Sequence, residues 1–171
     1  MTPGADSLAA RRVPVFYGAM RIGVISDTHG LLREEALDAL RDCDLIVHAG
    51  DIGTPQILER LREVAPTHAV RGNNDRAEWA RALPLNEVVT VGSHRLYLLH
   101  EIAHLDVDPA GDGFSAVITG HSHKPHAETR DGVLYLNPGS AGPRRFKLPI
   151  AVARLYVRER GLEHEILEFK A

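Results

Sequence analysis

The fold is decided by residues 21–51, RIGVISDTHGLLREEALDALRDCDLIVHAGD, where apolar and helical patterns alternate. Ile22–Ile25 is a short apolar run that predicts a buried strand. In Arg33–Arg41 the apolar residues recur on one face of a helix, and Leu45–Val47 is a second apolar run. This order predicts two parallel strands joined by a right-handed crossover.

The same order continues toward the C-terminus. Thr54 is followed by Pro55, a residue favoured at the first position of a helix, and the helical pattern runs to about Val64. His68–Val70 then predicts a third strand. The first half of the chain is therefore expected to form a β-α-β-α-β series.

The second half is richer in strands. Asp131-Gly132, between two strand patterns, is a strong hairpin signal. The sequence predicts one domain in which two packed sheets have helices outside them. The strands expected here are Glu87–Val91, Arg95–Leu99, Ala116–Thr119, His126–Arg130, Val133–Leu136, Ile150–Arg158 and Leu162–Phe169.

Residues 1–19, MTPGADSLAARRVPVFYGA, lack the periodicity of a core strand or helix. They also lack the continuous apolar stretch of a signal peptide. Because Met20 directly precedes the first strand, we expect either that translation starts at Met20 or that residues 1–19 form a loose, disordered arm. The folded domain is then expected to span residues 20–171.

Composition narrows the class of protein. The 171 residues are 44% apolar and 25% charged, which is typical of one globular domain. A net charge of −3 without a long basic stretch argues against binding of duplex nucleic acid, although a small nucleotide stays a candidate substrate. No apolar run is long enough for a bilayer, and the single Cys43 cannot form an internal disulfide. We therefore expect a cytoplasmic protein with no membrane partner.

Polar side chains follow five of the predicted strands. In open α/β sheets, ligands bind beyond the carboxyl ends of the strands, so these side chains are expected at one rim. Mixed oxygen and imidazole ligands suit Mn, Fe, Zn, Ni or Co better than Ca or Mg. The candidate ligands are Asp27, His29, Asp51, Asn73, His100, His121 and His123.

These motifs resemble those of the calcineurin-like metallophosphoesterases, in the branch of small single-domain bacterial and archaeal phosphodiesterases. The resemblance covers about residues 20–170 and implies a metallo-dependent phosphatase-like fold, a four-layer α-β-β-α sandwich of two mixed sheets flanked by helices. The family order D-x-H, G-D, G-N, H and G-H-x-H appears as Asp27-Thr28-His29, Gly50-Asp51, Gly72-Asn73, His100 and Gly120-His121-Ser122-His123.

The resemblance implies two divalent transition-metal ions, with Mn²⁺ first and Ni²⁺, Fe²⁺, Zn²⁺ or Co²⁺ as alternatives. One ion would be bound by Asp27, His29, Asp51 and His123, and the other by Asp51, Asn73, His100 and His121. Asp51 would bridge them, and Asp51, Asn73 and His100 would form the catalytic centre. The implied reaction is hydrolysis of a phosphate ester by in-line attack of a hydroxide that bridges the ions.

Two positions depart from the family pattern. Many relatives carry a histidine after the metal-binding asparagine, where it can protonate the leaving oxygen, and this chain has Asn74. We expect a preference for good leaving groups, or help from another residue such as His104. Glu101 stands where relatives often have glycine, and Ile102–Gly113 looks short for the loop that normally covers the site.

Three residues are candidate substrate contacts. Asn137-Pro138-Gly139-Ser140 follows a strand and also resembles the family, so Ser140 or Arg144 is expected to meet a phosphate, together with Asn74. By analogy with the family, the substrate is a small phosphate ester, a diester more than a monoester. The resemblance also implies assembly as a dimer or tetramer.

Other interpretations stay open on sequence alone. Asp27 or Asp51 could cap the helix that follows it, and Asn73 could occupy a left-handed turn. Asp75 could orient a ligand or only close a turn, whereas His48 is expected in the core. A retromer subunit shares this fold and binds proteins instead of substrates, so the alternative function is a catalytically weak metal-binding scaffold. A third possible function is that of a metal-stabilised subunit of a larger enzyme.

Overall fold

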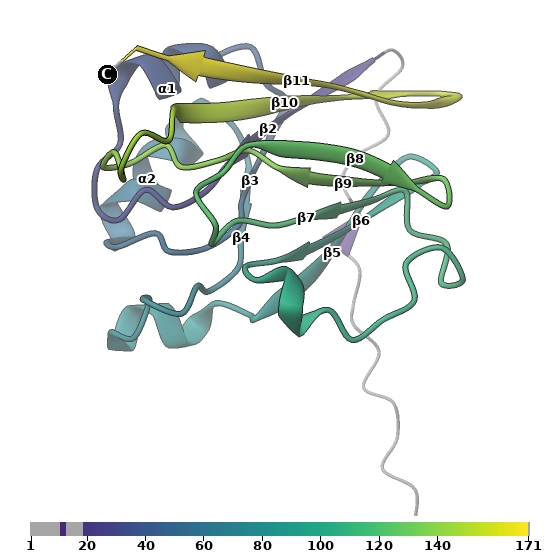
Figure 1. Cartoon of the computed structure of the whole chain (residues 1–171), viewed down its shortest axis with the longest axis horizontal. Coiled ribbons are helices and arrows are strands. Elements are labelled where there is room, and N and C mark those ends of the chain that lie inside the picture. Colours follow the sequence, from purple (N-terminus) through teal and green to yellow (C-terminus); the bar gives the residue numbers. More distant parts are fainter. Residues whose placement is uncertain (1–10, 13–18, 171) are drawn as a thin grey trace, which may run out of the picture.

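The strands of the deciding stretch lie at the centre of a five-stranded sheet. The computed structural model of the chain describes residues 11–12 and 19–170, and Figure 1 shows its two sheets. The strands of this sheet are β2 (Met20–Ile25), β3 (Leu45–His48), β4 (Thr67–Ala69), β10 (Ile150–Arg158) and β11 (Gly161–Phe169). Their order is β11-β10-β2-β3-β4, with β2, β3 and β4 parallel as predicted.

The second sheet has six strands and is also mixed. It contains β1 (Arg11–Arg12), β5 (Asn86–Val91), β6 (His94–Leu99), β7 (Ala116–Ile118), β8 (His126–Arg130) and β9 (Val133–Asn137). The order is β1-β5-β6-β7-β9-β8, in which β6, β7 and β9 are parallel. The predicted hairpin at Asp131-Gly132 joins β8 and β9.

The main core lies between the two sheets. Successive residues of a strand point to opposite faces, so Ile22 and Val24 face the second sheet while Ile25 faces the helices. On the other side of the core, Leu96, Leu98 and other residues of the six-stranded sheet meet them. The two expected sheets and their packing are confirmed.

Both predicted helices cover the five-stranded sheet. α1 (Glu34–Leu40) and α2 (Pro55–Val64) lie beside β2, β3 and β4 in Figure 1. Leu40 and Leu61 are fully buried against Ile46 and Val152 of that sheet. The 3-10 helix η1 (Glu78–Ala82), which the sequence analysis did not predict, adds Trp79 to the same layer.

The expected fourth layer differs from the structure. The outer face of the six-stranded sheet is covered by the segment after β6, from which Leu105, Val107 and Phe114 pack on Tyr97 and Val117. Within the described residues this segment contains only one 3-10 turn, η2 (Ile102–His104). A loop rather than an α-helix covers this face because Ile102–Gly113 carries Pro109 and two glycines, which disfavour a longer helix.

The N-terminal segment contributes one element. Arg11–Arg12 pairs in parallel with Val89 and Thr90 of β5, although the sequence predicts no strand there. Residues 1–10 and 13–18 lie outside the described residues, so the expected arm and the expected start at Met20 stay predictions. Across residues 11–12 and 19–170, no helix has the length and apolar character needed to cross a bilayer.

Candidate metal centre

The loops that end β2, β3, β6 and β7 meet at one place between the sheets. Gly120, after β7, donates its N–H to the carbonyl of His100 at 2.9 Å, and His121 donates its N–H to Asp27 Oδ2 at 3.0 Å. His100 Nδ1 lies 2.7 Å from the carbonyl of Ala49. The ends of strands from both sheets are therefore hydrogen-bonded to each other around the candidate ligands.

The backbone at this place is unusual. Left-handed φ values are uncommon outside glycine, although Asp and His adopt them more often than most residues do. Apart from glycines, seven of the described residues have a positive φ, and five of these are candidate ligands. These turns aim the side chains inward, at a strain on the order of 1 kcal/mol or more each. The five are Asp27, His29, Asp51, His121 and His123.

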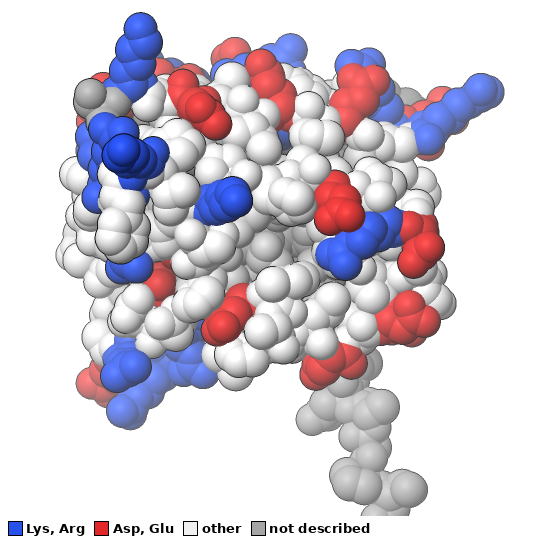
Figure 2. Space-filling view, in the orientation of Figure 1, with Lys and Arg blue, Asp and Glu red and all other residues white. Residues whose placement is uncertain are grey.

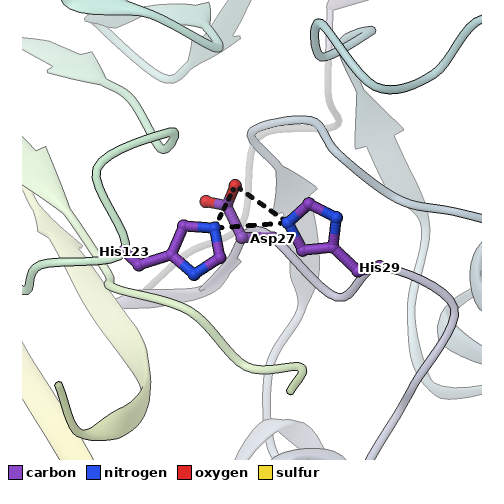
Figure 3. Close-up of side chains that lie close together, drawn as sticks. All are labelled: Asp27, His29 and His123. Atoms are coloured by element: carbon purple, nitrogen blue, oxygen red, sulfur yellow. Dashed lines mark hydrogen bonds and ion pairs between the residues drawn. The ribbon is translucent and has the colours of Figure 1, made fainter. Parts of the chain in front are cut away.

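One group of side chains combines the D-x-H and G-H-x-H motifs. Figure 3 shows Asp27, His29 and His123 pointing toward one another. Asp27 Oδ1 lies 3.3 Å from His123 Nε2 and 3.7 Å from His29 Nε2, and the two Nε2 atoms are 3.2 Å apart. Three possible ligand atoms thus converge on one point.

A second group shares Asp27 with the first and adds Asp51 and His100. Asp51 Oδ2 lies 3.3 Å from His100 Nε2 and 3.7 Å from His29 Nε2, so this carboxylate faces both groups. Asn73 Oδ1 lies 3.0 Å from His100 Nε2 and 3.2 Å from His121 Nδ1. The structure thus brings all seven predicted ligands together.

The donor set fits metal ions. Asp27 Oδ1 is buried and has no hydrogen-bond partner among the described residues, which is costly for a carboxylate oxygen. The same oxygen faces the Nε2 atoms of His29 and His123, which lie too close together for both of them to carry a hydrogen. Oxygen and nitrogen lone pairs that converge in this way suit a divalent transition metal.

Both carboxylates stay ionised. Burial would raise the pKa of Asp27, but its contact with His123 and the charge of His100 outweigh burial and lower the pKa. Burial also opposes ionisation of Asp51, yet His100 and two hydrogen bonds from Asn74 hold its pKa well below the usual range. Burial lowers the pKa of His29, which favours the neutral ring that can bind a metal.

Two glycines allow the motifs to approach each other. A Cβ on Gly72 would collide with the carboxylate and the backbone of Asp51. A Cβ on Gly120 would collide with Ser26 and would lie 2.8 Å from Asp27 Oδ2. The glycines of the G-N and G-H-x-H motifs are therefore required for the close contact between the loops that carry the candidate ligands.

His48 lies in the core, as expected, and links two of the loops. Gly50 donates its N–H to His48 Nδ1 at 3.1 Å, so the proton of the neutral ring is on Nε2. Nε2 lies 3.0 Å from Thr28 Oγ1, whose hydroxyl donates to the carbonyl of Ile52 at 2.8 Å. The His48 ring thus ties the loop of Asp27 to the loop of Asp51.

We expect His48 to make the metal-free protein less stable in mild acid. Burial lowers the pKa of His48 from 6.5 to about 4. The unfolded chain therefore binds a proton below pH 6.5 that the folded chain excludes, so stability is complete above 6.5 and falls as the pH drops toward 4. From pH 7 to pH 5 this loss is about 2 kcal/mol.

Urea unfolding in the presence of a chelator, at pH 7 and at pH 5, measures this loss. A His48→Gln variant should lose about 2 kcal/mol less than the wild type between the two pH values, because glutamine does not titrate. Equal losses in the two proteins would contradict the prediction.

The three residues predicted to contact the substrate lie in three different environments. Asn74 donates its backbone N–H and its amide to the two oxygens of Asp51, at 2.9 and 2.8 Å. Ser140 is 3% exposed and its hydroxyl donates to the carbonyl of Asp27, so it supports the loop instead of reaching a substrate. Arg144 is exposed, and its contact with phosphate stays a prediction.

The alternative structural roles are not observed for Asp27, Asp51 and Asn73. The N-caps of α1 and α2 are Arg33 and Thr54, so neither Asp27 nor Asp51 caps a helix. Asn73 is absent from the residues with positive φ. Asp75 does close its turn, because its carboxylate accepts the N–H of Gly72, and it also accepts the N–H groups of Ile52 and Gly53.

Sequence reasoning did not assign a role to Glu101. Its Oε1 lies 3.6 Å from His121 Nε2, while the other nitrogen of that ring faces Asn73. A carboxylate behind a metal-binding imidazole fixes its tautomer and makes it a better ligand. The only signal in the sequence was the unusual glutamate directly after His100.

Replacing Glu101 with glutamine is expected to weaken metal binding about 10-fold, because the carboxylate behind His121 is lost. Calorimetric titration of the metal-free protein with Mn²⁺ measures this change. Glu163→Gln removes the same charge from an exposed position on β11 and should leave the affinity unchanged. Equal affinities in wild type and Glu101→Gln would show that Glu101 does not act on His121.

The fold and the site together define an α/β sandwich of the metal-dependent hydrolase class. The chain belongs to the calcineurin-like phosphoesterase superfamily, because the family model of that superfamily's domain matches residues 20–160 of its sequence. This result confirms the resemblance found in the motifs.

Individual relatives agree with the family. The chain is 35% identical to a probable metallophosphoesterase of Methanothermobacter thermautotrophicus over 86% of its length and 92% of the relative's. It is 26% identical to a phosphodiesterase of Methanocaldococcus jannaschii, over 70% and 83% of the two lengths. Among solved structures, Vps29 of Chaetomium thermophilum aligns with a TM-score of 0.71 over 88% of this chain and 98% of that one. At 20% identity this likeness concerns the fold alone.

Proposed function

We propose that this protein hydrolyses phosphate esters, diesters in preference to monoesters, at a centre that binds two divalent metal ions. The observation that carries this proposal is the buried Asp27 oxygen without a hydrogen-bond partner, which faces His29 and His123. The family of the chain and the phosphodiesterase among its relatives support the type of reaction.

Asp27, His29, Asp51 and His123 would hold one ion, and Asp51, Asn73, His100 and His121 the other. Bound ions of this kind acidify water and neutralise the charge of a phosphoryl group during in-line displacement. The protein contributes two ionised carboxylates and four imidazoles, of which the His100 ring is oriented by its hydrogen bond to the carbonyl of Ala49. Asn73 and His121 are exposed, whereas Asp27, Asp51 and His123 are buried, so the substrate approaches from the side of Asn73 and His121.

Metal dependence tests the proposal. Metal-stripped protein should not hydrolyse bis-p-nitrophenyl phosphate, and addition of Mn²⁺ should restore hydrolysis. If the protein binds Mn²⁺ but hydrolyses no ester, the proposed function is wrong.

Asn74 predicts a strong dependence on the leaving group. Asn74 offers no proton of useful pKa, and its amide is bonded to Asp51. His104, the other candidate donor, lies on the exposed turn η2 with its Nδ1 3.8 Å from Glu101 Oε2. A missing general acid lowers the rate by about 100-fold or more when the leaving group is basic. We therefore expect p-nitrophenyl esters to react at least about 100-fold faster than alkyl esters.

An Asn74→His variant sharpens this test. Histidine restores a proton donor, so the variant should gain rate on alkyl esters and gain little on p-nitrophenyl esters, which need no proton. Measured kcat values for the two ester classes in both proteins give the answer. If Asn74→His raised kcat equally for alkyl and p-nitrophenyl esters, the wild type would not be limited by the lack of a general acid.

The alternative function is a metal-binding scaffold, which the likeness to Vps29 keeps open at the level of the fold. The convergence of seven candidate ligands favours the enzyme, because a scaffold does not require them. Tight binding of Mn²⁺ without hydrolysis would favour the scaffold. Manganese as the native metal, a dimer or tetramer, and a cytoplasmic location stay predictions from the sequence.

A further inference from the structure

The loop between β9 and β10 is fastened directly to the D-x-H loop. Ser140 Oγ donates to the carbonyl of Asp27 at 2.9 Å, and Ala141 donates its N–H to the carbonyl of Ser26 at 3.0 Å. Gly142 lies so close to Thr28 that a Cβ would collide with its carbonyl. Residues that follow Gly142 are therefore held at the edge of the candidate metal centre.

This loop carries three cations around one aromatic ring, in the order Arg144-Arg145-Phe146-Lys147. All four residues are exposed. Figure 2 shows Lys and Arg side chains gathered at the left edge of the molecule, where Figure 1 places this loop.

Phe146 is held in a conformation that does not serve packing. Its side chain is 93% exposed, the most among the described large apolar residues that lie on the surface. Its φ is +53°, and the N–H of Leu148 bonds to the carbonyl of Arg145 to close the turn. Among the residues that the structure describes, the other non-glycine residues with positive φ are five candidate ligands and Asp131 in a hairpin, so Phe146 is the single bulky apolar one. A bulky residue in this region is a genuine outlier.

Together these features describe a surface that suits a phosphate ester with an aromatic ring. The arginines attract the phosphoryl group toward the centre, and the exposed Phe146 face offers a stacking platform for a flat ring. We infer that Phe146 and Arg145 form a subsite for the ester group that stays on phosphorus, and that this group carries an aromatic ring such as a nucleobase. The inference rests on the proposed function, since it names the substrate class of the same site.

Two esters with the same leaving group test the subsite. In thymidine 5′-(p-nitrophenyl) phosphate and in methyl p-nitrophenyl phosphate, water forms the new P–O bond. In both, p-nitrophenolate leaves with the electron pair of the broken bond, and the water proton goes to solvent. Only the thymidine ester has a base to stack. One stacked base contributes about 10-fold or more, so the wild type should have a kcat/KM about 10-fold higher for the thymidine ester.

Phe146→Ala should remove this advantage through a higher KM for the thymidine ester and should change the methyl ester less than about 2-fold. Phe146→Tyr keeps the ring and should keep the advantage. Leu85→Ala truncates another exposed apolar residue and should change neither ester. Equal effects of Phe146→Ala on both esters, or no effect on either, would overturn the inference.

Binding of the product separates this inference from the proposed function. Calorimetric titration of the Mn²⁺-loaded protein with thymidine 5′-phosphate should show an affinity that Phe146→Ala weakens about 10-fold, whereas inorganic phosphate should bind both proteins equally. If neither ester is hydrolysed but this difference in binding is found, the proposed function fails and the subsite is supported. If Phe146→Ala instead changes the molar mass measured by light scattering, Phe146 contacts a second copy of the chain and the subsite is wrong.

Discussion

Replacing Asp51 with asparagine should lower the Mn²⁺-dependent hydrolysis of bis-p-nitrophenyl phosphate by on the order of 1000-fold. Asp51 is 2% exposed, and its Oδ2 faces His100 of one ligand group and His29 of the other. Its low pKa makes it an anion at neutral pH. Asparagine has almost the same size but no charge, and its NH₂ group cannot bind a metal ion.

The Asp51→Asn protein should also bind fewer metal ions per chain, which metal analysis after desalting measures independently of activity. Asp131→Asn is the matched control. Asp131 shares the left-handed backbone of Asp51 but lies exposed in the hairpin between β8 and β9. It should change neither rate nor metal content, and an Asp51→Asn protein with the rate of the wild type would place the catalytic centre elsewhere.

The second large effect is expected on stability. Asp75 is 4% exposed, and its carboxylate accepts hydrogen bonds from the backbone of Ile52 and Gly53 on one side and of Gly72 on the other. It therefore ties the loop of Asp51 to the loop of Asn73. Asp75→Ala leaves three N–H groups without their acceptor, and we expect a loss of about 3 kcal/mol in the free energy of unfolding.

Urea unfolding of the metal-free proteins measures this loss without any contribution from ligand binding. Asp75→Asn keeps one acceptor oxygen and should lose less than Asp75→Ala. Asp112→Ala removes an exposed carboxylate that accepts one backbone N–H, from Asp108, and should change stability by less than about 0.5 kcal/mol. Similar stabilities of Asp75→Ala and the wild type would mean that the backbone holds the two loops without Asp75.

The regular elements were predictable because their patterns are local. β2, β3, β4, α1 and α2 lie within a few residues of the predicted ranges, since apolar runs and a helical stripe are visible in the sequence itself. The fourth layer was predicted from the family and not from the chain, and the chain has a loop there. η1 and η2 were missed, since 3-10 turns have no comparable periodicity.

The candidate ligands were also predictable, because each follows a strand and belongs to an ordered set of motifs. The residues that contact the candidate ligands and hold them in place were not predictable. That Ser140 faces the carbonyl of Asp27, and Glu101 faces His121, depends on contacts between segments far apart in the chain. The role of Asp75 was open for the same reason, since its three partners lie on two different loops.

The candidate ligands follow strands of both sheets: β2, β3 and β4 belong to one, and β6 and β7 to the other. Bound ions would therefore cross-link two layers that otherwise meet through apolar contacts and a few hydrogen bonds, such as that from the His121 N–H to Asp27. Metal binding and docking of the sheets must stabilise each other, because the site exists only when both layers are in place. Neither half of the chain would hold both ions by itself, so full metal affinity requires both sheets to be in place.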